Sequence, residues 1–346
     1  MVSARSLSNG RLVAELDDNG ALVSIRSLEH DRELLVPGRR VELELTPDHP
    51  VEYDAWDLEG WARRRSRTLR GPATVEVLER GPLLGAVRVT RADGPSTFVV
   101  TYRLTAGSGR LDLAVDVDWQ HEEHLLSMAF PLDVRAEEAT CDIQFGHVRR
   151  PTHASSSWDA AKFEVCAHRF VDLSEPSFGV AVLNDGRYGH AVQGDAVRVS
   201  LLRAARYPDP QADRGRHEVT LALVPHGAGL AAVLEQAEAL NRPPRVLTGG
   251  SSPSSPAPIV SVEGGAAEVV AVKGADDRSG DVVLRLHEAL GDRSTVRLQF
   301  ARDVRRAGRC SVLEDPGDEL PVDGNAVELL LRPFELVSLR VRLAGS

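Results

Sequence analysis

Cysteine is scarce in this sequence, and long apolar runs are missing from it. The three cysteines, Cys141, Cys166 and Cys310, are odd in number, widely spaced and form no Cys-x-x-Cys pair. That pattern argues against a disulfide framework or a cysteine-based zinc site, and is typical of a reducing compartment. No stretch approaches a membrane span and the first residues lack a signal-peptide core, so we predict a cytoplasmic protein without a membrane partner.

An excess of positive charge is also lacking. The chain has 41 lysines and arginines against 51 aspartates and glutamates, a formal net charge of −10, and no long block of like charge. Such a chain cannot follow a phosphate backbone, so we predict no nucleic-acid partner. At 346 residues the chain is longer than a domain with a single hydrophobic core usually is, so two domains are expected.

Motifs of several enzyme classes are absent as well. The sequence has no Gly-x-Ser-x-Gly, no P-loop and no Gly-x-Gly-x-x-Gly, so acyl transfer, phosphoryl transfer and dinucleotide chemistry have no signature. The nearest approach to a metal motif is His121-x-x-His124. On a strand or turn this spacing should aim the two imidazoles apart, so we predict a polar turn and no metal site in this chain.

What the sequence does contain is alternation of apolar and polar residues with a period of two. Short runs rich in Val, Leu and Thr, such as 98–104 and 111–119, are separated by Asn-Gly, Asp-Gly and Gly-Pro turns. This pattern predicts an all-β fold of antiparallel strands. Asn19-Gly20 indicates a hairpin with a type I′ turn, and helical spacing of apolar residues predicts one helix within 228–244.

Composition places a domain boundary near residue 250. Residues 246–258 are rich in Gly, Ser and Pro without apolar periodicity, which is typical of a linker. We therefore predict a large β domain at 1–245 and a smaller β-sandwich at 259–346, where about six further short strands alternate.

Aromatic and polar residues gather in several predicted loops. Aromatic planes beside carboxylates are typical of a sugar-facing surface, because a sugar ring offers an apolar face and hydroxyl groups. Each residue taken singly is more often packing or a turn, so only the joint pattern favours binding. Four loops carry this pattern, with Tyr53, Asp54, Trp56, Asp57 and Trp61, then His147, His153, Trp158, Asp159 and Lys162, then Asn184, Asp185 and Tyr188, and finally Arg203, Tyr207, Asp209, Asp213, Arg214 and His217.

The stretch 162–168 after Trp158-Asp159 alternates like a strand. Phe163, Val165 and Ala167 fall on one face, and Lys162, Glu164, Cys166 and His168 fall on the other. We predict that the second face is the polar side of a sheet.

Three long segments of the chain are distinctive: "FGHVRRPTHASSSWDAAKFEVCAHRF", "VSLLRAARYPDPQADRGRHEVTLALVPH" and "LRPFELVSLRVRL". With them, the chain resembles the C-terminal half of glycoside hydrolase family 38 α-mannosidases of the cytosolic and bacterial branch. The resemblance implies a galactose-mutarotase-like supersandwich followed by a smaller β-sandwich, with one helix between them. It also implies a retaining hydrolase whose zinc ion and nucleophilic Asp belong to an N-terminal catalytic domain. No cofactor is then expected in this chain.

In the family, loops of this region face the catalytic domain. The resemblance therefore implies that eight of the loop residues are supporting, non-catalytic substrate contacts: Tyr53, Asp54, Trp56, Asp57, Trp158, Asp159, Arg203 and Asp213. The implied partners are an α-mannoside and the catalytic region, in cis or in trans, and a homo-oligomer stays open. Two alternatives remain: an autonomous carbohydrate-binding module, and an aldose 1-epimerase-like enzyme. The latter would recruit Glu164 as base and His147, His168 or His217 as acid.

Overall fold

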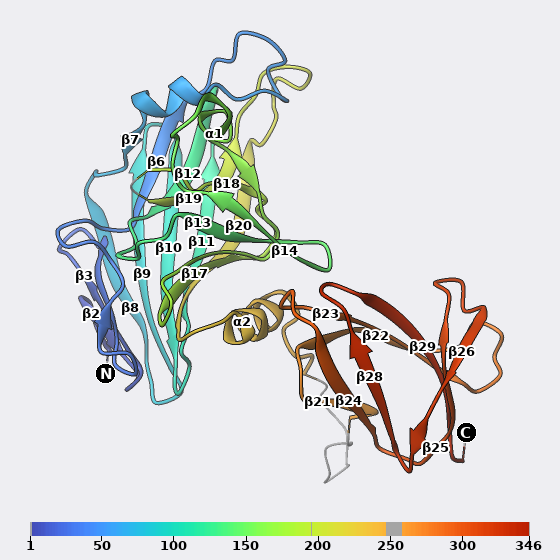
Figure 1. Cartoon of the computed structure of the whole chain (residues 1–346). Helices are drawn as coiled ribbons and strands as arrows, with labels where there is room; N and C mark the ends of the chain where they lie inside the picture. Colours follow the sequence, from blue (N-terminus) through green and yellow to red (C-terminus); the bar gives the residue numbers. More distant parts are fainter. Residues whose placement is uncertain (1, 195, 247–257, 346) are drawn as a thin grey trace. The chain divides into compact units, whose positions relative to one another are not determined.

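In the computed structural model, residues 2–194, 196–246 and 258–345 are described, and the fold is all-β (Figure 1). They form two compact units: Met1–Asp142 with Val148–Pro243, and Ile143–His147 with Pro244–Ser346. Of the predicted linker 246–258, residues 247–257 lie outside the described residues. No helix in the described part is long and apolar enough to cross a membrane.

Three antiparallel sheets build the first unit. The five-stranded sheet contains β1 (Val2–Ser3), β2 (Ser6–Ser8), β3 (Leu12–Leu16), β4 (Leu22–Ser27) and β5 (Arg32–Glu33). The nine-stranded sheet has the order β14 (Gly146–Pro151), β13 (Glu138–Ile143), β16 (Phe170–Ser174), β17 (Gly179–Asn184), β20 (Gly215–His226), β11 (Leu111–Trp119), β10 (Ser96–Thr105), β9 (Leu84–Asp93), β8 (Ala73–Arg80). The six-stranded sheet has the order β15 (Val165–Cys166), β18 (Gly189–Ala191), β19 (Val197–Arg203), β12 (His124–Phe130), β6 (Glu42–Pro47), β7 (Arg67–Thr68).

Alternating side chains of these sheets meet in one apolar core. Leu113 and Val115 of β11 are buried there with Met128 of β12 and Leu45 of β6. Strand β17 is different, because all six of its residues are buried. The helix α2 (Ala231–Asn241) explains this, since Val233 and Ala237 pack with residues of β17 and β20 in a second cluster. The predicted helix is thereby confirmed.

The second unit is a sandwich of two further antiparallel sheets. The four-stranded sheet has the order β21 (Val260–Glu263), β24 (Ser294–Phe300), β28 (Ala326–Leu331), β27 (Val322–Asp323). The five-stranded sheet has the order β22 (Ala267–Gly274), β23 (Val282–Glu288), β29 (Leu336–Leu343), β25 (Val304–Cys310), β26 (Pro316–Leu320). Apolar residues of both sheets form a separate core, including Leu298, Leu329, Leu339 and Val341.

Two local predictions need correction, and two short helices were not predicted. The hairpin β3–β4 exists, but only Gly20 has a positive φ (+73°) and Asn19 does not, so the turn is not type I′. Asp17 instead shapes a longer loop, because its carboxylate accepts the backbone N–H groups of Asn19 and Ala21 at 2.9 Å. The stretch 162–168 contains only the two-residue strand β15. Two short helices, η1 (Gly60–Arg65) and α1 (Ser157–Ala160), lacked any periodic signal because each is too short to show one.

A buried ion pair joins β16 and β20 in the nine-stranded sheet. Asp172 and His226 are both nearly inaccessible, and their Oδ1 and Nε2 atoms lie 2.8 Å apart. The other ring nitrogen of His226 faces the carbonyl oxygen of Gly227 at 2.8 Å. Burial lowers the pKa of His226, but the hydrogen bond and charge of Asp172 outweigh it, so the pKa is raised above 6.5. The ion pair with Asp172 therefore stabilises the charged form of His226 in the folded chain.

This pair predicts that the folded chain loses stability as the pH rises. A histidine whose pKa is raised by folding contributes stability below its unfolded pKa of about 6.5, and loses it as the pH passes through the folded value. We expect the free energy of unfolding, measured in urea at pH 6 to 9, to fall across this range. The decline should be shallower in His226→Gln; an equal decline in that variant would assign the pH dependence to other groups.

Candidate functional site

Three connecting segments gather at one end of the first unit, and we call residues 48–66, 153–164 and 203–215 the loop end (Figure 1). The strand register brings two of them together. On opposite sides of β12, His124 pairs with Pro47, the last residue of β6, and Leu125 pairs with Arg203, the last residue of β19. Strands β6 and β19 therefore finish at the same end of the six-stranded sheet, and the segments that follow them start side by side.

Arg203 holds the first of these segments in place. Its Nε and Nη2 atoms bind the carboxylate of Asp48, whose side chain is only 2% exposed, with Nη2 to Oδ1 at 3.3 Å. Its Nη1 donates to the carbonyl oxygen of Ala55 at 3.3 Å, and Nη2 donates to that of Asp57. The guanidinium is thus occupied by protein acceptors, which makes Arg203 a positioning residue in this structure.

Three aspartates predicted as substrate contacts also accept hydrogen bonds from the backbone of the loops. Asp54 accepts the backbone N–H groups of Arg206 and Tyr207, both at 2.8 Å, and so ties segment 48–66 to segment 203–215. Asp213 accepts the N–H of Arg203 at 3.0 Å. The Oδ1 atom of Asp57 accepts the adjacent N–H of Leu58 at 2.9 Å. These hydrogen bonds fix the conformations of the loops that carry the three carboxylates.

The selected aromatic residues, in contrast, point outward. Trp158 is 81% exposed, Trp56 is 69% exposed and Tyr53 is 68% exposed. Tyr53 also has a left-handed φ of +53°, a conformation that costs a non-glycine residue about 1–2 kcal/mol. The hydrogen bonds of Arg203 and Asp54 restrain this loop and offset that cost. Tyr207 of segment 203–215, which belongs to the same loop pattern, is also largely exposed.

Asp159 belongs to the short helix that carries Trp158. The hydroxyl of Ser156 donates to its carboxylate at 2.7 Å and accepts its N–H at 3.1 Å, so Ser156 caps α1. This hydrogen bond, with smaller effects of the charges of His153 and Lys162, lowers the pKa of Asp159. Gln193 anchors the turn by donating to the carbonyl oxygen of Asp159 at 2.5 Å.

The polar residues around β15 are partly buried against the rest of the unit. Glu164 forms an ion pair with Arg63 of η1 and accepts a hydrogen bond from Ser200 of β19. His168 lies against Tyr188, with ring centroids 4.7 Å apart. Glu164 therefore anchors the segment that follows Trp158, and its engaged carboxylate does not favour the role of general base in an epimerase.

The prediction that His121 and His124 point apart is wrong. Their rings meet edge to face with centroids 5.4 Å apart. Both nitrogens of His121 have other partners, Ser96 at 2.7 Å and Asp93 at 3.1 Å. Within the described ranges, no group of three or more His, Cys, Asp or Glu side chains could hold a metal ion. The described residues therefore do not fit a zinc ion, and we derive no chemical step through one.

Asp48 is a residue of the loop end that sequence reasoning missed. It follows a predicted strand without any motif, and its partner Arg203 lies 155 residues away. Only strand register brings such a pair together.

The fold and this loop end define a two-unit all-β module with an exposed aromatic surface. The sequence matches the family model "Glycosyl hydrolases family 38 C-terminal domain" over residues 7–211 and "Glycosyl hydrolases family 38 C-terminal beta sandwich domain" over residues 266–339. The chain belongs to glycosyl hydrolase family 38, as its C-terminal domains, which confirms the resemblance found in the sequence.

Known relatives agree with this assignment. The chain is 37% identical to alpha-mannosidase 2C1 of Homo sapiens over 96% of its own length, and 28% identical to alpha-mannosidase of Saccharomyces cerevisiae over 97%. It spans only about a third of these proteins, 33% and 34%. The crystal structure of an alpha-mannosidase from Enterococcus faecalis shares the fold, with a TM-score of 0.79 over 97% of this chain and 42% of that one at 18% identity.

Proposed function

We propose that this chain is a non-catalytic β module of a zinc-dependent, retaining α-mannosidase that hydrolyses terminal α-mannosides. In that enzyme the module completes the substrate site through its loop end and stabilises the assembly. The catalytic region, in cis or in trans, supplies the zinc ion and the nucleophile. We also propose that the enzyme acts in the cytoplasm, and its oligomeric state stays open.

One observation carries this proposal: the loop end presents exposed aromatic side chains on segments that are themselves held firmly. Ion pairs and backbone hydrogen bonds occupy Arg203, Asp54 and Glu164, whereas Trp56 and Trp158 have most of their surface in solvent. Large exposed aromatic residues on a preorganised surface are typical of binding sites, because their burial on contact is favourable and costs little conformational entropy.

The test is to replace the exposed aromatic residues in the enzyme that joins this chain to its catalytic region. We expect Trp56→Ala and Trp158→Ala each to lower kcat/KM for an aryl α-mannoside by about tenfold, close to 1.4 kcal/mol, without a change in melting temperature. Leu83→Ala is the matched control, because Leu83 is 76% exposed but lies between β8 and β9, outside the loop end.

Unchanged kcat/KM in both tryptophan variants would contradict the proposed contribution to the substrate site. If the chain alone binds mannosides through these tryptophans while the enzyme is unaffected, the autonomous carbohydrate-binding module is the better description.

A further inference from the structure

The outer face of the five-stranded sheet in the second unit is strongly charged. Leu339 and Val341 of β29 belong to the core of the sandwich, so the intervening Arg340 points to the opposite face. The register pairs Gly308 of β25 with Arg340, and Arg306 with Arg342, which puts the three arginines on one surface. Three arginines side by side would repel one another without compensating carboxylates.

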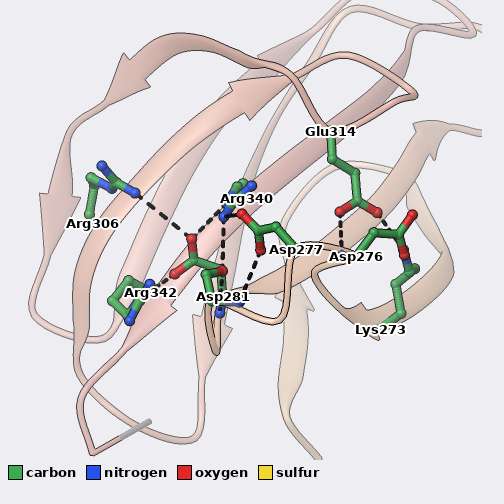
Figure 2. Close-up of polar contacts among 9 residues, drawn as sticks. Lys273, Asp276, Asp277, Asp281, Arg306, Glu314, Arg340 and Arg342 are labelled. Atoms are coloured by element: carbon green, nitrogen blue, oxygen red, sulfur yellow. Dashed lines mark hydrogen bonds and ion pairs between the residues drawn. The ribbon is translucent and has the colours of Figure 1, made fainter.

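The loop between β22 and β23 supplies that compensation (Figure 2). Asp281, only 2% exposed, accepts hydrogen bonds from Nε of Arg340 at 2.6 Å and from Nε of Arg342. Asp277 binds Nη2 of Arg340, and Ser279 accepts from the same nitrogen at 2.8 Å. Arg340 is therefore neutralised within the fold.

A second loop, between β25 and β26, is tied to the first. Glu314 of this loop is buried, forms an ion pair with Lys273 and accepts the backbone N–H of Asp276 at 2.8 Å (Figure 2). Lys273 also binds Asp276 at 2.5 Å. Glu314 has a left-handed φ of +71°, which these contacts maintain. The two loops thus form linked, preorganised walls.

Between these walls and β25 lies a cavity of about 510 Å³, which we call the charged groove. Its volume is within the range of small-molecule sites. Its lining carries side chains of both signs rather than one. They are Asp276, Asp277, Glu314, Asp315 and Glu319, with Arg306, Arg309 and Arg340.

Two charged side chains at the groove keep most of their hydrogen-bonding capacity. Arg306 is 62% exposed and reaches Asp281 only at 3.8 Å, beyond hydrogen-bond distance. The side chain of Glu319 is exposed and makes no hydrogen bond or ion pair within the described part of the chain. Leu313, 85% exposed, adds an apolar surface to the same lining. The groove therefore offers a donor, an acceptor and an apolar contact.

We propose that the charged groove binds a neutral saccharide, independently of the loop end. Sugar hydroxyls both donate and accept, so one ring can engage Arg306 and Glu319 together while a C–H face covers Leu313. A simple anion would meet the carboxylates of the lining, and a simple cation would meet its arginines, at an unfavourable electrostatic cost. Because the inner charges are already paired, the groove has no large excess of either sign to attract such an ion.

The proposal is tested by NMR titration of the ¹⁵N-labelled full chain with mannobiose, cellobiose and lactose, and separately with inorganic phosphate and Ca²⁺. We expect saturable shifts of the amide signals of Gly308, Leu313 and Gly317 with at least one disaccharide, at a Kd in the millimolar range, about 1–10 mM. Arg306→Ala and Glu319→Gln should each raise that Kd at least about tenfold.

Matched controls are Arg305→Ala, an exposed neighbour outside the groove lining, and Glu328→Gln, an exposed glutamate on β28 of the other sheet. Both should leave the Kd unchanged, and ¹⁵N spectra of all variants should show the folded chain. The proposal is overturned if none of the three disaccharides shifts the groove signals at 100 mM. It is equally overturned if only phosphate or Ca²⁺ binds, or if the groove variants bind sugar as tightly as the controls.

Discussion

The purified chain by itself is expected to show no detectable hydrolysis of an aryl α-mannoside, with Zn²⁺ or with a chelator. Retaining glycoside hydrolysis needs a nucleophilic carboxylate and a general acid that face the anomeric carbon. The carboxylates of Asp48 and Asp54 are instead engaged in holding loops, and the described residues contain no group that fits a metal ion. Binding through exposed aromatic residues does not stabilise an oxocarbenium-like transition state.

When the chain is joined to its catalytic region, we expect the rate of hydrolysis to exceed the uncatalysed rate by a factor of at least about 10⁶, the lower range of enzymatic rate enhancements. The measurement is release of the aryl group by chain, catalytic region and joined enzyme at equal concentration. Hydrolysis by the chain alone that a chelator abolishes, and that co-elutes with it through two chromatographic steps, would refute the non-catalytic assignment.

The second large effect is expected for Arg203→Ala, which should destabilise the folded first unit by about 3–5 kcal/mol. The reason is that the carboxylate of Asp48 stays buried after its ion-pair partner is removed. The loop that carries Tyr53 and Trp56 also loses the hydrogen bonds of Arg203 to Ala55 and Asp57. Urea unfolding monitored by tryptophan fluorescence measures the change.

Conservative and compensating variants separate this positioning role from a direct sugar contact. Arg203→Lys should recover only part of the stability, because lysine keeps the charge but lacks the planar fork. Arg203→Met combined with Asp48→Leu should be less destabilised than Arg203→Ala, since no buried charge remains.

Arg206→Ala is the surface control. Arg206 is 58% exposed and lies 3.7 Å from Glu123, so its loss should cost within about 0.5 kcal/mol. If Arg203→Ala proves as mild as Arg206→Ala but impairs sugar binding, Arg203 is a ligand contact and the positioning role is wrong.

The sequence predicted the elements of the fold where a periodic pattern was long enough to read. The alternation of 98–104 and 111–119 corresponds to β10 and β11, and the helical spacing near residue 233 corresponds to α2. The predictions from the sequence failed at short or irregular elements. The Asn19-Gly20 turn is set by the side chain of Asp17. The stretch 162–168 contains only a two-residue strand, and Glu164, just before it, pairs with Arg63 of η1.

What the sequence by itself determined is the all-β class, the helix around residue 233, and the family, since each rests on local pattern or on long matching motifs. Which site residues face solvent was decided only by the tertiary structure. Trp56 and Arg203 looked equivalent in the sequence, yet Trp56 is exposed and Arg203 is bound to Asp48. The physical reason is that the partners of a charged side chain are set by strand register across 155 residues, which no local pattern records.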